Sequence, residues 1–273
     1  MILEYIYWNV NPEILKLGPI ALRWYGLLFA TAFIFGYYIF KNIFKKEGYT
    51  IEMLDQLTVY MAVGTIIGAR LGHVLFYDPD YYFSNPLEII AVWKGGLASH
   101  GGAIGILIAL YLWVRKHKLN FMWLLDRIAI VVALGGMFIR LGNLMNSEIY
   151  GIETSLPWGF IFVREGETLP KHPTQIYEAL SYLIIFLFLF ISYKKNILYN
   201  NRGISFGIFL ILLFSARFLI EFIKNPQEEF EKFLPLNMGQ ILSLPFIIAG
   251  FIIIFLATKN KFDSKINHKT IQK

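Results

Sequence analysis

The run "ISFGIFLILLFSARFLIEFI" (residues 204–223) decides the class of fold. Its only charged side chains are Arg217 and Glu221, and both lie toward its C-terminal end. A helix of about 20 apolar residues is long enough to cross the hydrocarbon core of a bilayer. Residues 204–223 are therefore predicted to form a transmembrane helix whose polar groups lie close to one membrane surface.

The composition of the whole chain agrees with a membrane protein. Of its 273 residues, 56% are hydrophobic and 16% are charged, whereas a soluble domain typically has about 25% charged residues. The mean hydropathy is +0.54. The chain has no cysteine, which excludes disulfides and catalysis by a thiolate of its own. The N-terminal stretch "MILEYIYWNVNPEILKLGPIALRWYG" lacks the basic start and the cleavage site of a signal peptide, so the first span is expected to remain in the mature protein.

Seven apolar runs follow one another with short connections and predict a single all-α bundle of transmembrane helices. The predicted spans are residues 18–40, 52–77, 97–114, 124–144, 176–193, 204–223 and 238–258. Residues 1–258 are accordingly predicted to form one polytopic membrane domain, followed by a basic cytoplasmic tail at 259–273.

Basic residues gather at alternate ends of the predicted spans. Lys45 and Lys46 follow the first span, Arg115 and Lys116 follow the third, and several lysines lie in 259–273. Because loops rich in lysine and arginine stay in the cytoplasm, the N-terminus is predicted outside and the C-terminus inside. The excess of basic residues that gives the net charge of +6 would then face the anionic lipid of the inner leaflet, which attracts it. No nucleic-acid partner is therefore expected.

The longer of the two main outer loops is predicted to form a small extracytoplasmic cap. It covers residues 145–175 and contains "LPWGFIFVREGETLPKHP" (156–173). This stretch is too polar to span the membrane and is rich in residues that form turns.

Polar residues gather at the outer ends of several predicted spans. The stretch "GGMFIRLGNLMNSEIYG" (135–151) places Arg140, Asn143 and Glu148 at the end of the fourth span. With a helical rise of about 1.5 Å per residue, the following residues of other spans lie at a similar depth: Tyr25, Arg70, His100, Arg217 and Glu221. Ionisable groups within a membrane are functional candidates by default. These residues are therefore predicted to converge on one site.

Each of these residues, taken alone, also has a structural interpretation. Arg70 and Arg140 could extend their guanidinium groups to the lipid headgroups. Arg217 and Glu221 could form an ion pair between residues one helical turn apart. The histidine and the tyrosine could be ordinary interfacial residues. Their occurrence together at one depth favours the functional interpretation.

The residue types indicate the ligand. A guanidinium presents a planar fork that suits phosphate oxygens, and it stays charged in a site of low dielectric constant. Asparagine and tyrosine add neutral donors, and a histidine can take up a proton near neutral pH. The glycines of "HGG" (100–102) would let the backbone approach a ligand closely. An anionic headgroup held by arginines beside a base indicates phospholipid chemistry at the outer leaflet.

The sequence resembles the prolipoprotein diacylglyceryl transferase family over nearly its whole length. The block "RLGNLMNSEIYG" (140–151) matches the specific signature of that family. The other matching motifs, in order, are "RWYG" (23–26), "ARLGHVLFY" (69–77), "WKGGLASHGGAIG" (93–105), "HPTQIYE" (172–178), "RFLIEFIKNP" (217–226) and "MGQILSLP" (238–245). One departure is Leu213, where some members have a tyrosine one turn before the matching arginine.

The resemblance implies transfer of the sn-1,2-diacylglyceryl group from phosphatidylglycerol to the lipobox cysteine thiol of a preprolipoprotein at the bacterial inner membrane, with the site toward the outer leaflet. The products implied are a thioether and glycerol 1-phosphate. The residues carried over by motif are Tyr25, His100, Arg140, Asn143, Glu148, Gly151, Arg217 and Glu221. Arg70, within a matching motif, is added as a substrate-binding candidate.

In the mechanism expected from this resemblance, Arg140 and Arg217 bind the phosphate and His100 deprotonates the thiol. Asn143 and Tyr25 orient the headgroup, and Glu148 or Glu221 fixes an arginine. No metal or other cofactor is expected, because no cluster of histidines and acidic residues has ligand spacing.

Two other classes of protein remain alternatives. A transporter or flippase for an anionic lipid could use the same arginines, but it would need polar groups at the midplane of the membrane. An intramembrane serine protease would need Ser99 or Ser215 as its nucleophile. Ser99 is adjacent to His100, which is a poor arrangement for a serine–histidine hydrogen bond.

Overall fold

The computed structural model describes residues 5–17, 20–225 and 235–262. The chain divides into two compact units, and each is described by itself. The first unit comprises Met1–Tyr38 and Leu125–Ser264, and the second comprises Ile39–Leu124 with Lys265–Lys273. Most of the predicted tail, residues 263–273, lies outside the described residues.

Six helices in the described part of the chain are long and apolar enough to cross a membrane. They are α1 (Trp24–Lys46), α2 (Ile51–Phe76), α6 (Phe121–Met145), α7 (Thr174–Lys194), α8 (Ile204–Ile220) continued by the 3-10 turn η3 (Glu221–Ile223), and α9 (Met238–Thr258). The predicted span 97–114 also forms a helix, α5 (Ser99–His117). It is not among these six, so its crossing of the membrane stays a prediction. The prediction of a mainly helical membrane protein is confirmed.

The first helix begins later than predicted. Residues Ile20–Arg23 form strand β3, which pairs with β2 (Glu13–Leu17) in an antiparallel hairpin, and α1 starts only at Trp24. In this hairpin the backbone N–H and C=O groups of the two strands pair with each other, so these residues do not need a helix to satisfy them. Apolar periodicity alone does not distinguish a short strand from a helix end, so the predicted start near residue 18 was wrong.

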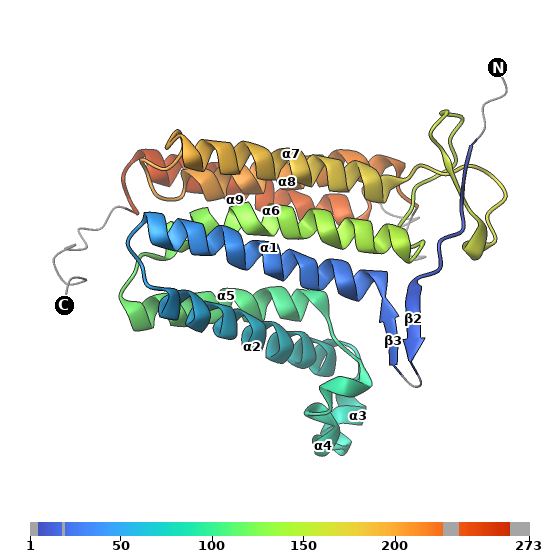
Figure 1. Ribbon diagram of the computed structural model, residues 1–273, viewed down its shortest axis with the longest axis horizontal. Coiled ribbons are helices and arrows are strands. Elements are labelled where there is room, and N and C mark those ends of the chain that lie inside the picture. Colours follow the sequence, from blue (N-terminus) through green and yellow to red (C-terminus); the bar gives the residue numbers. More distant parts are fainter. Residues whose placement is uncertain (1–4, 18–19, 226–234, 263–273) are drawn as a thin grey trace. The chain divides into compact units, whose positions relative to one another are not determined.

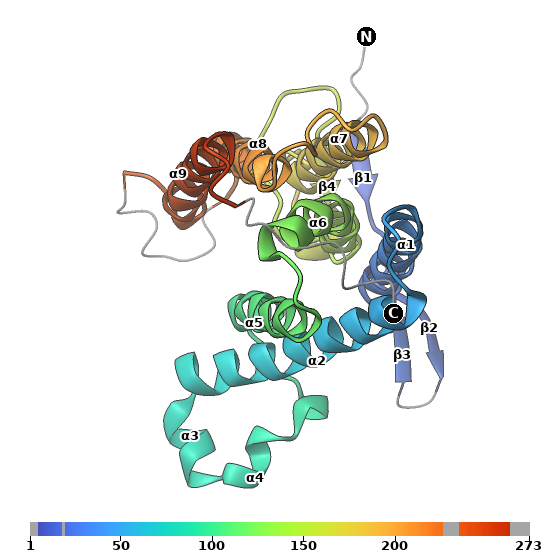
Figure 2. The ribbon, with the colours of Figure 1, turned by 90° about the vertical axis from the view of Figure 1, so that its left-hand side faces the viewer.

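In the first unit, α6, α7, α8 and α9 lie side by side with their axes roughly aligned (Figures 1 and 2). The contact between α8 and α9 depends on Gly207 and Gly250. A Cβ atom on Gly207 would lie 2.9 Å from the carbonyl oxygen of Gly250, and one on Gly250 would lie 2.8 Å from that of Gly207. Small residues let helix backbones approach closely, which is a main source of packing energy inside a membrane.

A buried carboxylate fixes the beginning of α8. Asp126 of α6 is fully buried and accepts hydrogen bonds from the backbone N–H groups of Gly203 (2.7 Å) and Phe206 (2.8 Å). The first N–H groups of a helix have no partner within the helix. Asp126 therefore caps α8 from another helix, which accounts for a charged residue near one end of α6.

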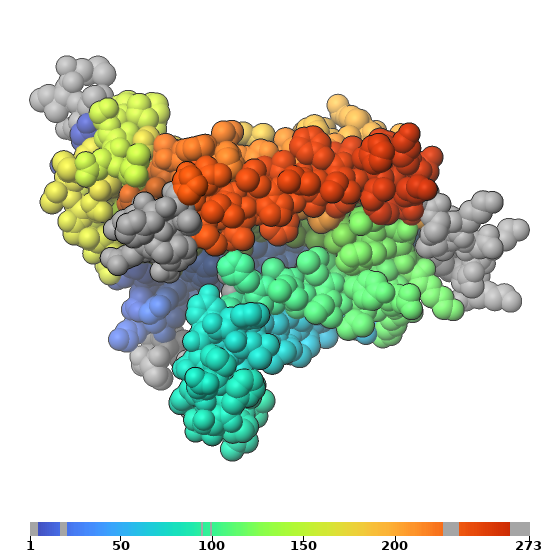
Figure 3. Space-filling view, turned by 180° about the vertical axis from the view of Figure 1, so that it is seen from behind, coloured from blue at the N-terminus to red at the C-terminus, as the bar shows by residue number. Residues whose placement is uncertain are grey.

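The loop after α6 folds into a small cap at one end of the first unit, as Figure 3 shows. Strand β4 (Phe160–Phe162) pairs in parallel with β1 (Ile6–Trp8) and is followed by the 3-10 turn η2 (Val163–Glu165). Phe160 and Phe162 pack with Leu144 and the half-buried Tyr150 in a small apolar core. Burial and a 2.8 Å hydrogen bond to Glu167 raise the pKa of Tyr150 to about 12, so its hydroxyl stays protonated and holds the loop.

In the second unit, α2 packs against α5 through glycines. Side chains on Gly68 or Gly101 would clash with the backbone of the facing helix. The expectation that the "HGG" glycines admit a ligand is thus corrected for Gly101, whose missing side chain is needed for contact with α2. Beyond this pair the chain forms α3 (Pro79–Ser84), α4 (Pro86–Ile89) and the 3-10 turn η1 (Val92–Lys94) (Figure 2).

Candidate functional site

A tight turn between α6 and the cap presents the first part of the site. Ser147 and Ile149 have positive φ angles of 57° and 61°, and this region is unfavourable for a β-branched residue such as isoleucine. The first residues of α7 hold the turn: Thr174 donates to the carbonyl of Ile149 (2.8 Å) and Gln175 to that of Glu148 (2.7 Å). The strained turn directs the chain so that the carboxylate of Glu148 returns toward α6.

Glu148 is linked to Arg140 through a buried amide. The side-chain NH₂ of Asn143 donates to Glu148 Oε1 (2.8 Å), and its Oδ1 accepts from Arg140 Nη1 (3.2 Å). Asn146 donates to the same carboxylate oxygen of Glu148 (3.2 Å). The structure thus brings together three of the predicted residues, Arg140, Asn143 and Glu148, around the end of α6.

A buried ion network lies on the other side of Arg140. Glu178 of α7 is fully buried. Its Oε2 lies 3.0 Å from Arg140 Nε, and its Oε1 accepts a hydrogen bond from Lys224 Nζ at 3.0 Å. Lys224 also donates to Glu221 Oε2 (3.2 Å). Two cations and two carboxylates therefore alternate along a chain from α6 through α7 to η3, which keeps the buried charges compensated.

The start of α9 closes over Glu221. A side chain on Gly239 would overlap the Glu221 carboxylate, and Asn237 donates to the Glu221 carbonyl (3.0 Å). The ion pair considered between Arg217 and Glu221 is not found in the described part of the chain, where the Glu221 carboxylate pairs with Lys224. The ion pair with Glu221 is therefore excluded as the structural interpretation of Arg217, and its role in the site stays a prediction.

Two further predicted residues lie near this network in the first unit. The buried Tyr182 is an electrostatic neighbour of Arg140, Arg217 and Glu178, which places Arg217 beside the same group of charges. The ring of Tyr25 packs against α6 so closely that a Cβ atom on Gly142 would lie 2.7 Å from its Cδ2.

Gly151 has a steric role. A Cβ atom there would clash with the carbonyl of Ile223 and would lie 2.8 Å from the side chains of both His172 and Thr174. The backbone of Gly151 donates to the His172 carbonyl (2.8 Å), and Ile152 donates to that of Ile223 (2.9 Å). Gly151 is thus the point where the cap, the start of α7 and the end of η3 meet.

Arg70 and His100 belong to the second unit, and their predicted convergence with Arg140 stays a prediction. Arg70 is 4% exposed and donates to backbone carbonyls of the loop that follows α2, including Ile89 (2.9 Å) and Gly95 (2.6 Å). Its guanidinium also lies over the ring of Tyr82, 4.8 Å from the centroid. In the structure Arg70 thus shapes its own loop. His100 lies in the first turn of α5 and is exposed.

The sequence interpretation missed Glu178 and Lys224 as members of the site. Glu178 ends the motif "HPTQIYE" (172–178) but is not among the residues carried over by the resemblance, and the adjacent turn is held by Thr174 and Gln175. Lys224 follows an apolar helix end, where a lysine usually extends to the membrane surface, yet it is only 5% exposed. The available signal was its position three residues after Glu221, which allows an ion pair on one helical face.

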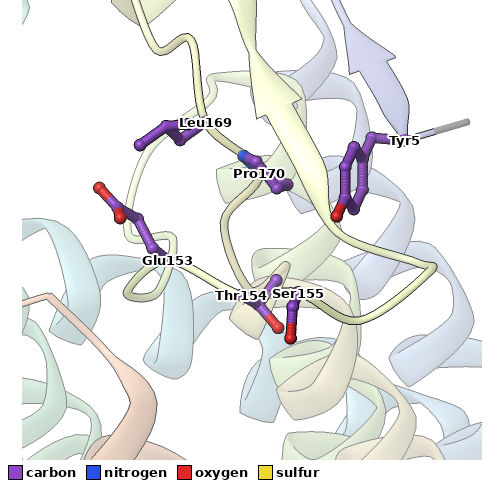
Figure 4. Close-up of a pocket in the computed structure, with 6 residues that line it drawn as sticks. All are labelled: Tyr5, Glu153, Thr154, Ser155, Leu169 and Pro170. Atoms are coloured by element: carbon purple, nitrogen blue, oxygen red, sulfur yellow. The ribbon is translucent and has the colours of Figure 1, made fainter. Parts of the chain in front are cut away.

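An open hollow of about 370 Å³ lies in the cap, lined by Tyr5, Glu153, Thr154, Ser155, Leu169 and Pro170 (Figure 4). None of the predicted site residues lines it. The charged network around Arg140, not this hollow, is therefore the candidate site.

The long apolar helices, together with the half-buried Arg140 and the buried lysine, carboxylates and amides gathered around it, define a multi-pass helical membrane protein with a polar site. A family model described as "Prolipoprotein diacylglyceryl transferase" matches residues 12–256. The chain belongs to this family, and its enzyme class is transferase. The alternative of a transporter is not favoured.

Curated relatives agree along almost the whole chain. The phosphatidylglycerol–prolipoprotein diacylglyceryl transferase of Tolumonas auensis is 49% identical over 257 residues, which cover 94% of this chain and 99% of the relative. The protein of the same name from Chloroherpeton thalassium is 48% identical, with 94% and 96% covered. That of Porphyromonas gingivalis is 45% identical, with 96% and 98% covered.

Replacing Gly151 by alanine tests its steric role. The added methyl group must displace the backbone at Ile223, so we expect a loss of stability of about 1–3 kcal/mol, measured as a lower midpoint of thermal unfolding in detergent. Gly135→Ala is the matched control, because its Cβ would meet only Ala32, at 4.0 Å. Unchanged stability in Gly151→Ala, with a raised KM for lipid, would show that Gly151 instead contacts the substrate.

Proposed function

We propose that this chain transfers the sn-1,2-diacylglyceryl group from phosphatidylglycerol to the lipobox cysteine thiol of preprolipoproteins, the first step of lipoprotein maturation. The products are the thioether and glycerol 1-phosphate. The observation that carries this proposal is the arrangement around Arg140 within a chain of this family. Arg140 is a mostly buried guanidinium, side chain 13% exposed, oriented by Glu178 and Asn143.

In the proposed mechanism, Arg140 and Arg217 bind the phosphate of the lipid. Glu178 forms an ion pair with Arg140 Nε, and Asn143 accepts a hydrogen bond from one N–H of Nη1. A guanidinium has five N–H donors. Donors that remain can bind phosphate oxygens and stabilise the negative charge that develops on the leaving oxygen. Tyr25 and Asn143 orient the headgroup, Glu148 holds Asn143, and Arg70 stays a candidate for substrate binding.

The proposed base is His100, which would take the proton of the substrate thiol. The thiolate sulfur then attacks the glycerol carbon that carries the phosphate, so that a C–S bond forms as the C–O bond breaks. The bonding pair of that C–O bond leaves with glycerol 1-phosphate. A free thiol is mostly protonated at neutral pH, so a base accelerates this step. The support for His100 is its place in the "WKGGLASHGGAIG" motif at the entry of α5.

The proposed location is the bacterial inner membrane, with the cap and the site outside and residues 259–273 in the cytoplasm. The basic residues that follow α1 and α5 support this orientation. Because the chain has no cysteine, single cysteines at the exposed positions Glu165 and Lys116 can be labelled without background. An impermeant thiol reagent on intact cells should label Glu165→Cys and not Lys116→Cys, while both should react after permeabilisation. The reverse pattern would contradict the orientation.

Replacing Arg140 by lysine tests the phosphate contact in an assay with labelled phosphatidylglycerol and a lipobox peptide. Lysine keeps the charge but loses the fork of donors, so kcat/KM should fall at least about tenfold, the cost of one hydrogen bond to a charged group. Arg164→Lys, an exposed arginine of the cap, is the matched control and should be unaffected. Turnover of Arg140→Lys close to wild type would favour an arginine that merely reaches the lipid headgroups.

Replacing His100 by glutamine tests the base. The variant should still bind phosphatidylglycerol but lose transfer rate by about 100- to 10,000-fold, the usual contribution of general-base catalysis. As pH rises toward about 8.5, the ordinary pKa of a thiol, the peptide supplies its own thiolate. The variant should therefore recover relative to wild type between pH 6.5 and 9. Parallel pH profiles would exclude His100 as the base.

A further inference from the structure

Glu178 is a branch point between two cations. One of its oxygens lies 3.0 Å from Arg140 Nε, and the other accepts from Lys224 Nζ, also at 3.0 Å. Glu178 is 0% exposed, Lys224 5% and Glu221 6%. Water therefore does little to screen these charges, and the way in which they share partners determines the local field.

The sharing decides how much charge Arg140 can offer a ligand. A buried carboxylate that faced only one guanidinium would compensate its charge almost completely. Here Lys224 draws on the same carboxylate, so Glu178 neutralises each cation only in part. Glu221, 3.2 Å from Lys224, compensates the remaining positive charge of the lysine. The four charges therefore balance without further neutralisation of Arg140.

Lys224 also connects α7 with the helix that carries Arg217. Glu178 lies in α7, and Lys224 follows η3, the continuation of the helix that carries Arg217. The backbone at this point is held as well, because Ile152 donates to the carbonyl of Ile223 and Gly151 forms a bridge with Lys224. The lysine is therefore fixed from both its backbone and its side chain.

We infer that Lys224 is a positioning residue for the lipid phosphate. By sharing Glu178 with Arg140, it leaves positive charge on Arg140 for an anionic headgroup, and it ties the end of α8 to α7. This inference rests on the proposed function. The inference predicts a difference between two lipids. Loss of the Lys224 charge weakens binding of an anionic lipid and leaves binding of a neutral diacylglycerol unchanged.

The experiment compares Lys224→Met, Lys224→Arg and the wild type in nanodiscs of neutral lipid. Steady-state transfer is measured against phosphatidylglycerol concentration, and binding of phosphatidylglycerol and of diacylglycerol is measured separately. Lys224→Met should raise KM and weaken binding of phosphatidylglycerol about tenfold, the scale of one hydrogen bond to a charged group. Lys224→Arg, which keeps the charge, should recover most of the binding.

Lys171→Met is the matched control. Lys171 also lies between two carboxylates, Glu167 at 3.1 Å and Glu153 at 3.3 Å, but these belong to the cap and make no contact with the Arg140 network among the described residues. Its KM and lipid binding should match those of wild type.

A purely structural role for Lys224 would instead lower the folded fraction and kcat and leave KM unchanged, which would overturn the inference.

A second variant covers the case in which Lys224→Met does not fold. The double variant Glu221→Gln with Lys224→Met removes one anion and one cation, so the network stays neutral while Glu178 faces Arg140 alone. A KM above that of Glu221→Gln alone supports the inference, and a KM equal to that of Glu221→Gln overturns it. Absence of transfer by the wild type would overturn the proposed function, while the comparison of phosphatidylglycerol with diacylglycerol binding would still decide the role of Lys224.

Discussion

The carboxylate of Glu178 is the constraint around which the first unit is arranged. A buried ion is costly, and removal of one partner of a buried pair typically destabilises a protein by about 3–5 kcal/mol. Glu178 therefore requires both Arg140 and Lys224 at close range. That requirement fixes the end of α6, the first turns of α7 and the segment after η3 relative to one another.

The backbone around this network follows from the same requirement. Gly239 leaves room for the Glu221 carboxylate, and Gly151 leaves room for the carbonyl of Ile223. The left-handed Ile149 is tolerated because Thr174 and Gln175 hold its turn by hydrogen bonds. Strain of this kind persists where the surroundings determine the backbone, and here it directs Glu148 toward Asn143.

Away from the charges, glycine serves helix packing. Between hydrocarbon-facing helices there is little hydrophobic driving force, so close contact and dispersion must supply the attraction. Gly207 and Gly250 allow this between α8 and α9, as Gly68 and Gly101 do between α2 and α5. The glycine next to His100, Gly101, was expected to admit a ligand, but in the structure it serves the contact between α5 and α2.

The sequence by itself determined the helical membrane class and placed Arg140, Asn143 and Glu148 at one helix end, because hydropathy, helix length and spacing along one segment are local properties. It did not reveal the β2–β3 hairpin, since a short apolar strand and a helix end have the same composition. Only the tertiary structure decided that Lys224 is buried, that Glu178 is shared and that Gly151 admits no side chain. Each of these depends on segments distant in sequence that meet at one point, where the cost of burying a charge or a Cβ atom depends on the neighbours that the fold supplies.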